Sequence, residues 1–249
     1  MNVVIIPARW GSTRFPGKPL HIIAGKPLLQ HVWERCGHAK KIQRTIIATD
    51  DMRIAEAAFD WGAEIALTSP THQSGTDRIA EVVTRAREFS LVVNVQGDEP
   101  LVDPALINRL VSSLQKDRRI GIVTAAHPFQ NRADAMSPHQ VKVVTNSAGH
   151  ALYFSRSVVP HPRDPRASVQ FLRHQGIYGF RRETLLRFVK WKPGPLEQAE
   201  SLEQLRALEN GVTVHVLVTK QGSPGIDTPE DAAALEQVLA HAGGRSIRR

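Results

Sequence analysis

Short apolar runs alternate along most of the chain with segments in which apolar residues recur every three or four positions. The runs at 2–8, 44–50 and 90–98 read "NVVIIPA", "RTIIATD" and "SLVVNVQGD" and predict buried strands. The intervening segments, such as "PLLQHVWERCGHA" at 27–39, predict amphipathic helices. Because the connections are short, we expect right-handed strand–helix–strand crossovers, with parallel strands and helices on both faces of the sheet. The expected fold class is therefore α/β, with a mostly parallel, Rossmann-like sheet.

The pattern changes after about residue 129. Two apolar runs within 140–155 are separated by "NSAG", which predicts a hairpin, and the segment 159–168 is rich in proline and charge and predicts a loop. A further strand is expected at 176–180. We interpret residues from about 130 to 180 as an antiparallel insertion within a single domain that spans 1–249. The α/β alternation then returns, with one helix expected over 195–211.

Composition and charge narrow the class of protein. The 249 residues are 41% hydrophobic and 22% charged, as in an ordinary globular protein, and no apolar run approaches the ~18–20 residues of a membrane span. The single cysteine, Cys36, lies among apolar positions, so we expect a buried, inert thiol and a reducing, cytoplasmic setting. The net charge of +8 favours an anionic partner. Because the basic residues are scattered rather than interleaved with aromatics, we expect a small molecule and no nucleic acid.

The first apolar strand is followed by a basic, glycine-containing loop, "IPARWGSTRFPGKPL" at 6–20. A loop at the carboxyl end of a parallel strand lies where open α/β sheets bind ligands. Arg9, Arg14 and Lys18 supply positive charge for phosphate, and Gly11 and Gly17 allow main-chain N–H groups to approach it. The residues alone fit a solvated basic loop equally well. The loop matches neither the Walker motif nor the dinucleotide fingerprint.

Three further loops carry candidate side chains at predicted strand ends. "NVQGDEP" at 94–100 places Asp98 where a carboxylate could hold Mg2+ beside a phosphate, although an acidic turn would look the same. In "GSPGIDTPED" at 222–231, Asp227 is either a second metal ligand or a charge that favours the following helix. Ser74 in "HQSGTDR" fits a helix cap. Sequence spacing cannot decide between these alternatives.

Several motifs, in order along nearly the whole chain, resemble the 3-deoxy-manno-octulosonate cytidylyltransferases, or CMP-Kdo synthetases. They are "PARWGSTRFPGKPL", "HQSGTDRIAEVV", "VVNVQGDEP", "VKVV…ALYFSRSVVP", "FLRHQGIYGF", "LEQAESLEQLRALENG" and "GIDTPED". The resemblance implies the nucleotide-diphospho-sugar transferase type of fold and a Mg2+-dependent enzyme. It implies that the C2 hydroxyl of Kdo attacks the α-phosphorus of CTP, giving CMP-Kdo and pyrophosphate for lipopolysaccharide biosynthesis.

Matching positions carry over the family's nucleotide and metal residues. The resemblance implies that Arg9 and Lys18 hold the triphosphate and stabilise the leaving pyrophosphate. It implies that Asp98 and Asp227 bind Mg2+, with one metal expected and a two-metal arrangement left open. These four residues are the expected catalytic set. The nucleotide-binding set implied by the resemblance is Ala8, Arg9, Ser12, Arg14, Lys18, Ser74 and Arg78.

The same resemblance implies a sugar-binding set. Its members are Gln96, Arg156, His174, Tyr178, Glu200, Glu203 and Gln204. Each has an ordinary alternative, because helix acids are usually solvated and the two aromatic residues also fit a core. Glu200, Glu203 and Gln204 fall on one face of the expected helix, which favours a shared role. For the sugar carboxylate, both Arg156 and Arg173 remain candidates.

The chain departs from the family pattern at a few positions. Trp10 and Phe15 stand where tyrosine-like and leucine-like residues are expected, and the loop "HPRDPRASVQ" is short. Because that loop belongs to the sugar side, the alternative substrates are 8-amino-Kdo and a sialic-acid-like sugar. The insertion at 130–180 resembles the family's dimer-forming part, which implies a homodimer.

Overall fold

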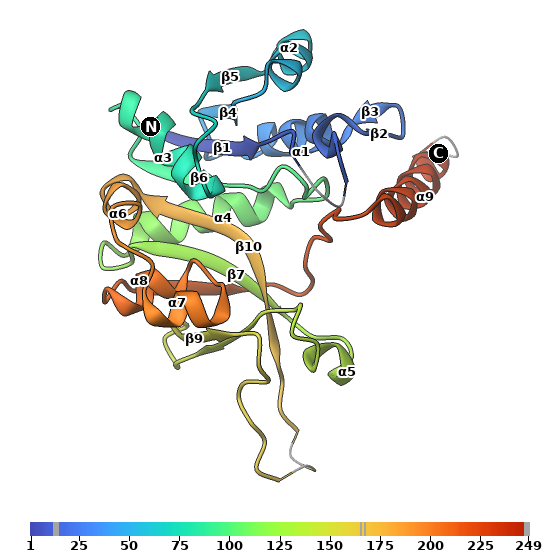
Figure 1. Cartoon of the computed structure of the whole chain (residues 1–249). Coiled ribbons are helices and arrows are strands. Elements are labelled where there is room, and N and C mark those ends of the chain that lie inside the picture. Colours follow the sequence, from blue (N-terminus) through green and yellow to red (C-terminus); the bar gives the residue numbers. More distant parts are fainter. Residues whose placement is uncertain (12–14, 165, 167, 247–249) are drawn as a thin grey trace. The chain divides into compact units, whose positions relative to one another are not determined.

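The computed structural model describes residues 1–11, 15–164, 166 and 168–246 (Figure 1). The chain forms two compact units. The first comprises Met1–Arg87, Asn94–Asn108 and Ser223–Arg249, and the second comprises Glu88–Val93 and Arg109–Gly222.

The first unit contains three parallel strands joined by helices. β4 (Arg44–Thr49) lies between β1 (Asn2–Ala8) and β5 (Glu64–Leu67), with Ile5 opposite Ile46. The connecting helices are α1 (Leu28–Gly37), α2 (Met52–Asp60) and α3 (Gly75–Arg85), and Figure 1 shows them beside these strands. These predicted elements are confirmed, because each shows the hydrophobic period of its own secondary structure.

Burial in α1 confirms the expectation for the only cysteine. Cys36 has no exposed surface and shares the buried face of α1 with Leu28, Leu29 and Val32. Burial disfavours the thiolate and strongly raises the pKa of the Cys36 thiol. The thiol is therefore unreactive.

Short elements follow β1 and complete this unit. A 3-10 turn, η1 (Lys18–Leu20), leads into a two-stranded ribbon of β2 (Ile22–Ile23) and β3 (Lys26–Pro27). The last helix, α9 (Pro229–Ser246), begins after Thr228, whose hydroxyl accepts a hydrogen bond from the Asp231 N–H. Thr228 therefore caps α9.

The second unit is built mainly of antiparallel strands. β7 (Ile122–Pro128) lies between β11 (Val214–Val218), which is parallel to it, and β10 (Leu172–Arg181), which is antiparallel. A hairpin of β8 (Lys142–Thr145) and β9 (Ala151–Ser155) adds to β10. The predicted antiparallel section is therefore confirmed, and the expectation of one domain over 1–249 stays a prediction.

The remaining elements are the strand β6, the helix α4 and four short helices. β6 (Leu91–Asn94) and α4 (Pro104–Lys116) agree with the predicted strand and helix. The Ala105 N–H donates to Asp103 Oδ1 at 2.9 Å, so Asp103 caps the N-terminus of α4. The short helices are α5 (Arg132–Ala135), α6 (Arg182–Phe188), α7 (Pro195–Glu200) and α8 (Leu205–Glu209).

The prediction of one continuous helix over 195–211 is wrong. α7 ends at Glu200 because Ser201 adopts a left-handed conformation with φ of 50°, and α8 begins only at Leu205. Left-handed backbone cannot continue an α-helix. As a result, Glu200 does not share a helical face with Glu203 and Gln204.

The α/β fold class is confirmed. A mostly parallel central sheet carries helices around it, and a small antiparallel ribbon stands apart. Across the described part of the chain, no helix combines the length and apolarity required to cross a membrane.

Candidate active site

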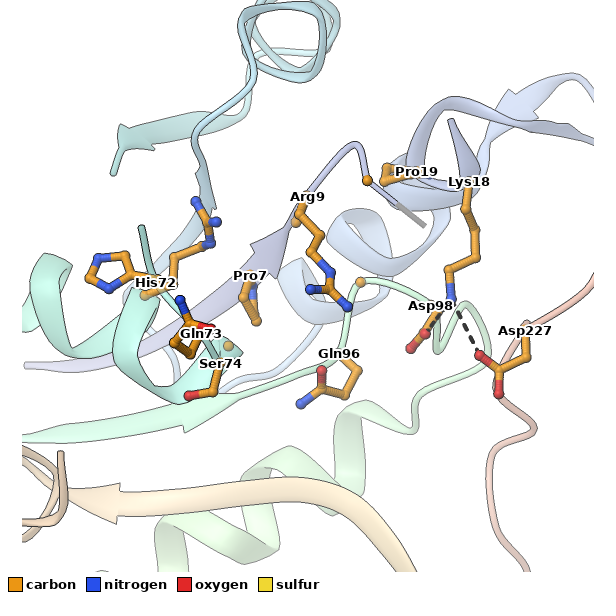
Figure 2. A pocket seen from close by; sticks show the side chains of 15 residues that line it. Pro7, Arg9, Lys18, Pro19, His72, Gln73, Ser74, Gln96, Asp98 and Asp227 are labelled. Atoms are coloured by element: carbon orange, nitrogen blue, oxygen red, sulfur yellow. Dashed lines mark hydrogen bonds and ion pairs between the residues drawn. The ribbon is translucent and has the colours of Figure 1, made fainter. Parts of the chain in front are cut away.

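A polar cavity of about 370 Å3 opens in the first unit, beyond the carboxyl end of β1. Figure 2 shows side chains from several loops that converge on it. Its lining consists of Pro7, Ala8, Arg9, Gly11, Lys18, Pro19, His72, Gln73, Ser74, Gly75, Arg78, Gln96, Gly97, Asp98 and Asp227. The volume falls in the range of small-molecule sites, which is about 300–1,000 Å3. The four loops singled out in the sequence therefore meet at one cavity.

Two glycines allow these loops to pack closely around Pro7. A Cβ at Gly97 would lie 3.1 Å from the Pro7 carbonyl oxygen and 3.3 Å from Leu29 Cδ1. A Cβ at Gly75 would lie 3.1 Å from Pro7 Cγ. All three distances are tighter than ordinary van der Waals contact, so larger residues would push the loops apart. The sequence thus brings the loop after β6 and the start of α3 against the end of β1.

Lys18 joins the two candidate metal carboxylates. Its Nζ donates to Asp98 Oδ2 at 2.6 Å and lies 3.5 Å from Asp227 Oδ1 (Figure 2). It also donates to the Ile226 carbonyl at 2.9 Å. The Lys18 side chain is only 15% exposed, which strengthens these interactions relative to those of a surface ion pair. The two aspartates, 129 positions apart in the chain, therefore share one cation.

Arg9 lines the cavity, and its N–H donors are available for a ligand. It is exposed, and in Figure 2 it extends from the end of β1 over the cavity. It makes no ion pair or hydrogen bond with other residues that the structure describes. An arginine with all its donors available suits an incoming phosphate, which it can grip through two parallel hydrogen bonds.

Arg78 lines the cavity and is held by two partners. It is only 5% exposed, donates to Thr68 Oγ1 at 2.6 Å, and lies 3.0 Å from Asp50 Oδ1. Its guanidinium therefore presents a fixed orientation to any ligand. Asp50 and Thr68 were not predicted, because a partner that follows a different strand leaves no local pattern in the sequence.

Ser74 caps a helix and also lines the cavity. Its hydroxyl accepts a hydrogen bond from the Asp77 N–H at 3.1 Å, which caps α3, and its side chain also lines the cavity. The adjacent His72 was missed as a lining residue, and its Nε2 contacts Glu81. Burial opposes ionisation of Glu81, but the Ser69 N–H, His72 and Arg85 together lower the pKa of its carboxyl. The loop before α3 is thus fixed by a carboxylate.

Two aromatic residues of the basic loop, Trp10 and Phe15, hold it against the rest of the unit. Phe15 is buried in a cluster with Ile23, Leu28, Ile226, Ala232 and Leu235. The guanidinium of Arg53 lies 3.7 Å from the centre of the Trp10 ring, a cation–π arrangement. The two departures from the family pattern therefore pack rather than project into the cavity. Ser12 and Arg14, also predicted for nucleotide binding, lie outside the described residues.

The predicted sugar-binding residues divide between the two units. Gln96 lines the cavity with Arg9 and Asp98. The other six belong to the second unit and are Arg156, His174, Tyr178, Glu200, Glu203 and Gln204. The carboxylate of Glu200 accepts hydrogen bonds from Ser155 Oγ at 2.6 Å and from the Arg156 N–H at 2.8 Å. Gln204 is 8% exposed, and Glu203 lies 3.9 Å from Arg206.

His174 packs between two rings of the second unit. Ring centroids lie 5.0 Å away for Phe154 and 5.5 Å away for Tyr178, and Nε2 is 2.9 Å from Thr124 Oγ1. Burial lowers the pKa of His174 to about 3. The imidazole is therefore neutral at physiological pH and acts through hydrogen bonds rather than charge.

The low pKa of His174 predicts a pH dependence of stability. The unfolded chain protonates His174 near pH 6.5, whereas the folded chain does so only near pH 3. Between these values the unfolded state binds more protons, so the free energy of unfolding falls as the pH falls from 6.5 towards 3. Thermal unfolding from pH 7 to pH 4 should show a shallower decline for His174→Gln than for the wild type. His139→Gln, at an exposed site in the same unit, is the control, and equal slopes for all three proteins would contradict the prediction.

Comparison with known proteins places these residues in a family. The sequence profile described as "Cytidylyltransferase" matches residues 3–215. The 3-deoxy-manno-octulosonate cytidylyltransferase of Myxococcus xanthus is 47% identical over 243 residues, which cover 98% of this chain and 98% of that protein. The protein of the same name from Pseudomonas syringae pv. tomato is 48% identical over 247 residues, covering 95% and 97% of the two chains.

Solved structures agree with the sequence relatives. A CMP:2-keto-3-deoxy-manno-octonic acid synthetase complexed with CTP matches with a TM-score of 0.93 and 38% identity, covering 97% of this chain and 99% of that chain. The 4-diphosphocytidyl-2C-methyl-D-erythritol synthase of Anaerococcus prevotii matches with a TM-score of 0.65 at 16% identity, covering 96% of each chain, and shares the fold alone.

Proposed function

We propose that this chain, which belongs to the 3-deoxy-manno-octulosonate cytidylyltransferase family, transfers CMP from CTP to the C2 hydroxyl of Kdo. The products are CMP-Kdo and pyrophosphate, and the activated sugar serves lipopolysaccharide biosynthesis. The observation that carries the proposal is the cavity itself, where Lys18, Asp98, Asp227 and an uncommitted Arg9 converge. Cationic and acidic groups in one cavity suit a triphosphate and its metal.

The reaction needs alignment and charge neutralisation more than a strong base. The sugar oxygen forms a bond to the α-phosphorus while the bond from that phosphorus to the pyrophosphate oxygen breaks. The hydroxyl proton leaves to solvent. Arg9 and Lys18 hold the triphosphate and stabilise the negative charge that develops on pyrophosphate. Ala8, Ser74 and Arg78 surround the cytosine and ribose, and the fixed guanidinium of Arg78 supports this role.

The donor set at the cavity fits Mg2+. Carboxylates are hard oxygen ligands, and the structure already brings Asp98 and Asp227 to one shared cation, the Lys18 ammonium. Among the residues described, no cluster of three or more acidic, histidine or cysteine side chains could enclose a metal by itself. This agrees with a site that is completed by substrate phosphates, as is usual for Mg2+. When bound, the metal would supply charge neutralisation at the phosphates, and Asp98 and Asp227 would hold it.

The Lys18 contacts predict how metal binding changes when the ammonium is removed. In Lys18→Met, measured without nucleotide, Mn2+ should bind at least ~10-fold more tightly, because the variant lacks a positive charge that repels the metal and occupies its ligands. Electron paramagnetic resonance of free Mn2+ at fixed ionic strength measures this affinity. Lys26→Met, at an exposed ion pair of the same unit, is the control. Unchanged affinity in Lys18→Met would contradict the prediction.

A separate set of residues is assigned to the sugar acid. Gln96, Arg156, His174, Tyr178, Glu200, Glu203 and Gln204 are the residues that we assign to it. The alternative substrates are 8-amino-Kdo and a sialic-acid-like sugar. Pyrophosphate release from CTP, measured with Kdo, 8-amino-Kdo and N-acetylneuraminate, tests the assignment. Turnover should be fastest with Kdo, and the absence of turnover with all three sugars would overturn the proposed function.

The proposed function also includes the oligomeric state of the enzyme and the cellular compartment in which it acts. We place the enzyme in the cytoplasm as a homodimer. In the second unit, β9 exposes Leu152 by 61%, an apolar surface that a second copy could cover. The buried, unreactive thiol of Cys36 is suited to a reducing compartment. Light scattering of the purified protein at micromolar concentration tests the dimer.

A further inference from the structure

The second unit contains a fully buried lysine, Lys142, at the start of β8. Its side chain has no exposed surface, and it makes no ion pair with other described residues. The ammonium instead donates to main-chain carbonyls of Ser137 at 2.9 Å, of Gln140 at 2.7 Å, and of Arg156. All three of its protons are therefore used by backbone oxygens.

Such an arrangement is costly for stability. Removing an ammonium from water is unfavourable, and burial indeed lowers the pKa of Lys142. Well-packed apolar side chains of similar volume are often neutral or stabilising replacements for buried charges. We therefore look for the role of Lys142 in the main-chain geometry that it fixes. Its ammonium links the segment 137–140 to the main chain of Arg156.

Arg156 both contacts Lys142 through its carbonyl and belongs to the residues that we assign to the sugar. Its Nε donates to the Glu200 carbonyl at 2.7 Å, and its two terminal nitrogens donate to the carbonyls of Pro138 at 3.2 Å and Ser201 at 3.4 Å. A guanidinium has five N–H donors, so one on each terminal nitrogen is left for a ligand. The side chain is half-exposed, and the two remaining donors match a carboxylate.

Lys142 and Arg156 act on the same short segment. The ammonium fixes the carbonyls of Ser137 and Gln140, and the guanidinium binds the carbonyl of Pro138 between them. The ammonium also binds the carbonyl of Arg156 itself. Without Lys142, both the main chain of Arg156 and one of the oxygens that orient its guanidinium would lose their support.

We propose that Lys142 is a positioning residue for the sugar acid, which it serves by orienting Arg156 towards the sugar carboxylate. This inference rests on the proposed function and assigns a role to a residue that does not itself contact substrate. It also favours Arg156 over Arg173, because the carbonyls of Pro138, Glu200 and Ser201 already orient the Arg156 guanidinium.

Steady-state kinetics of Lys142→Met test the inference. The KM for Kdo should rise at least ~10-fold, because a charge-assisted contact to the carboxylate is lost, while the KM for CTP stays within about twofold of the wild type. A loss of stability alone would reduce the active fraction and leave both KM values unchanged. Lys190→Met, at an exposed lysine of the same unit, is the matched control and should behave as wild type.

A milder variant keeps the test decisive if Lys142→Met does not fold. Lys142→Gln keeps two N–H donors for the main-chain carbonyls that the ammonium binds, and it should raise the KM for Kdo about threefold or more, again without effect on CTP. Lys190→Gln is its control. An unchanged KM for Kdo in a folded Lys142→Met, or in Lys142→Gln if that protein must be used, overturns the inference. A wild-type enzyme that turns over no sugar would instead overturn the proposed function.

Discussion

Replacement of Lys18 by methionine is expected to lower kcat with saturating CTP and Kdo by about 10²–10³-fold. Lys18 is the only described cation in contact with both Asp98 and Asp227, and we assign it to the leaving pyrophosphate. An oriented, largely buried donor that meets developing charge contributes more than the same charge in water. Initial-rate measurements of pyrophosphate release give kcat directly.

Two features of this experiment separate chemistry from folding. Lys26→Met removes an exposed ammonium from the same unit and should retain wild-type activity. Thermal unfolding of Lys18→Met reports whether the fold survives. A folded Lys18→Met with more than about half of wild-type kcat would contradict the role that we assign to Lys18.

The second large effect is expected from the carboxylates. Asp98→Asn should lower kcat by about 10²-fold or more and should raise the Mg2+ concentration needed for half-maximal rate, because an amide is a weaker ligand for a hard divalent cation than a carboxylate. Asp227→Asn should act in the same direction. Activity measured against Mg2+ concentration at constant ionic strength separates weaker metal binding from slower chemistry.

Asp103→Asn is a closely matched control for Asp98→Asn. Asp103 follows the same loop but caps α4 through Oδ1, a role that asparagine performs equally well. We expect wild-type activity and an unchanged Mg2+ dependence in this variant. Full activity in Asp98→Asn or in Asp227→Asn would remove that residue from the proposed metal site.

Much of the fold could be predicted because most elements follow a clear hydrophobic period. β1, β4 and α1 to α3 agree with the predicted strands and helices. The break between α7 and α8 could not be predicted, since "LEQAESLEQLRALENG" has a helical pattern throughout. Partners distant in the chain hold the end of α7, because Glu200 accepts hydrogen bonds from Ser155 and the Arg156 main chain. Tertiary contacts here override local propensity.

Only part of the candidate site could be predicted from the sequence. Arg9, Lys18 and Asp98 could be proposed because they follow predicted strands, and parallel strands place such loops at one edge of a sheet. The spacing of Asp227 left two roles open, and only its proximity to Lys18 joins it to Asp98. The motif "VKVV" contains Lys142, but the role of this residue could not be predicted, because its partners are backbone carbonyls, which every residue has.

In the reaction that we propose, the enzyme forms a bond between the α-phosphorus of CTP and the C2 oxygen of Kdo. Phosphorus NMR of a reaction with CTP, Mg2+ and Kdo labelled with 13C at C2 tests it most directly. We predict one new phosphodiester resonance that is coupled to the labelled carbon, with an equimolar amount of pyrophosphate. Release of pyrophosphate with CMP alone, or a phosphodiester without coupling to C2, would contradict the account.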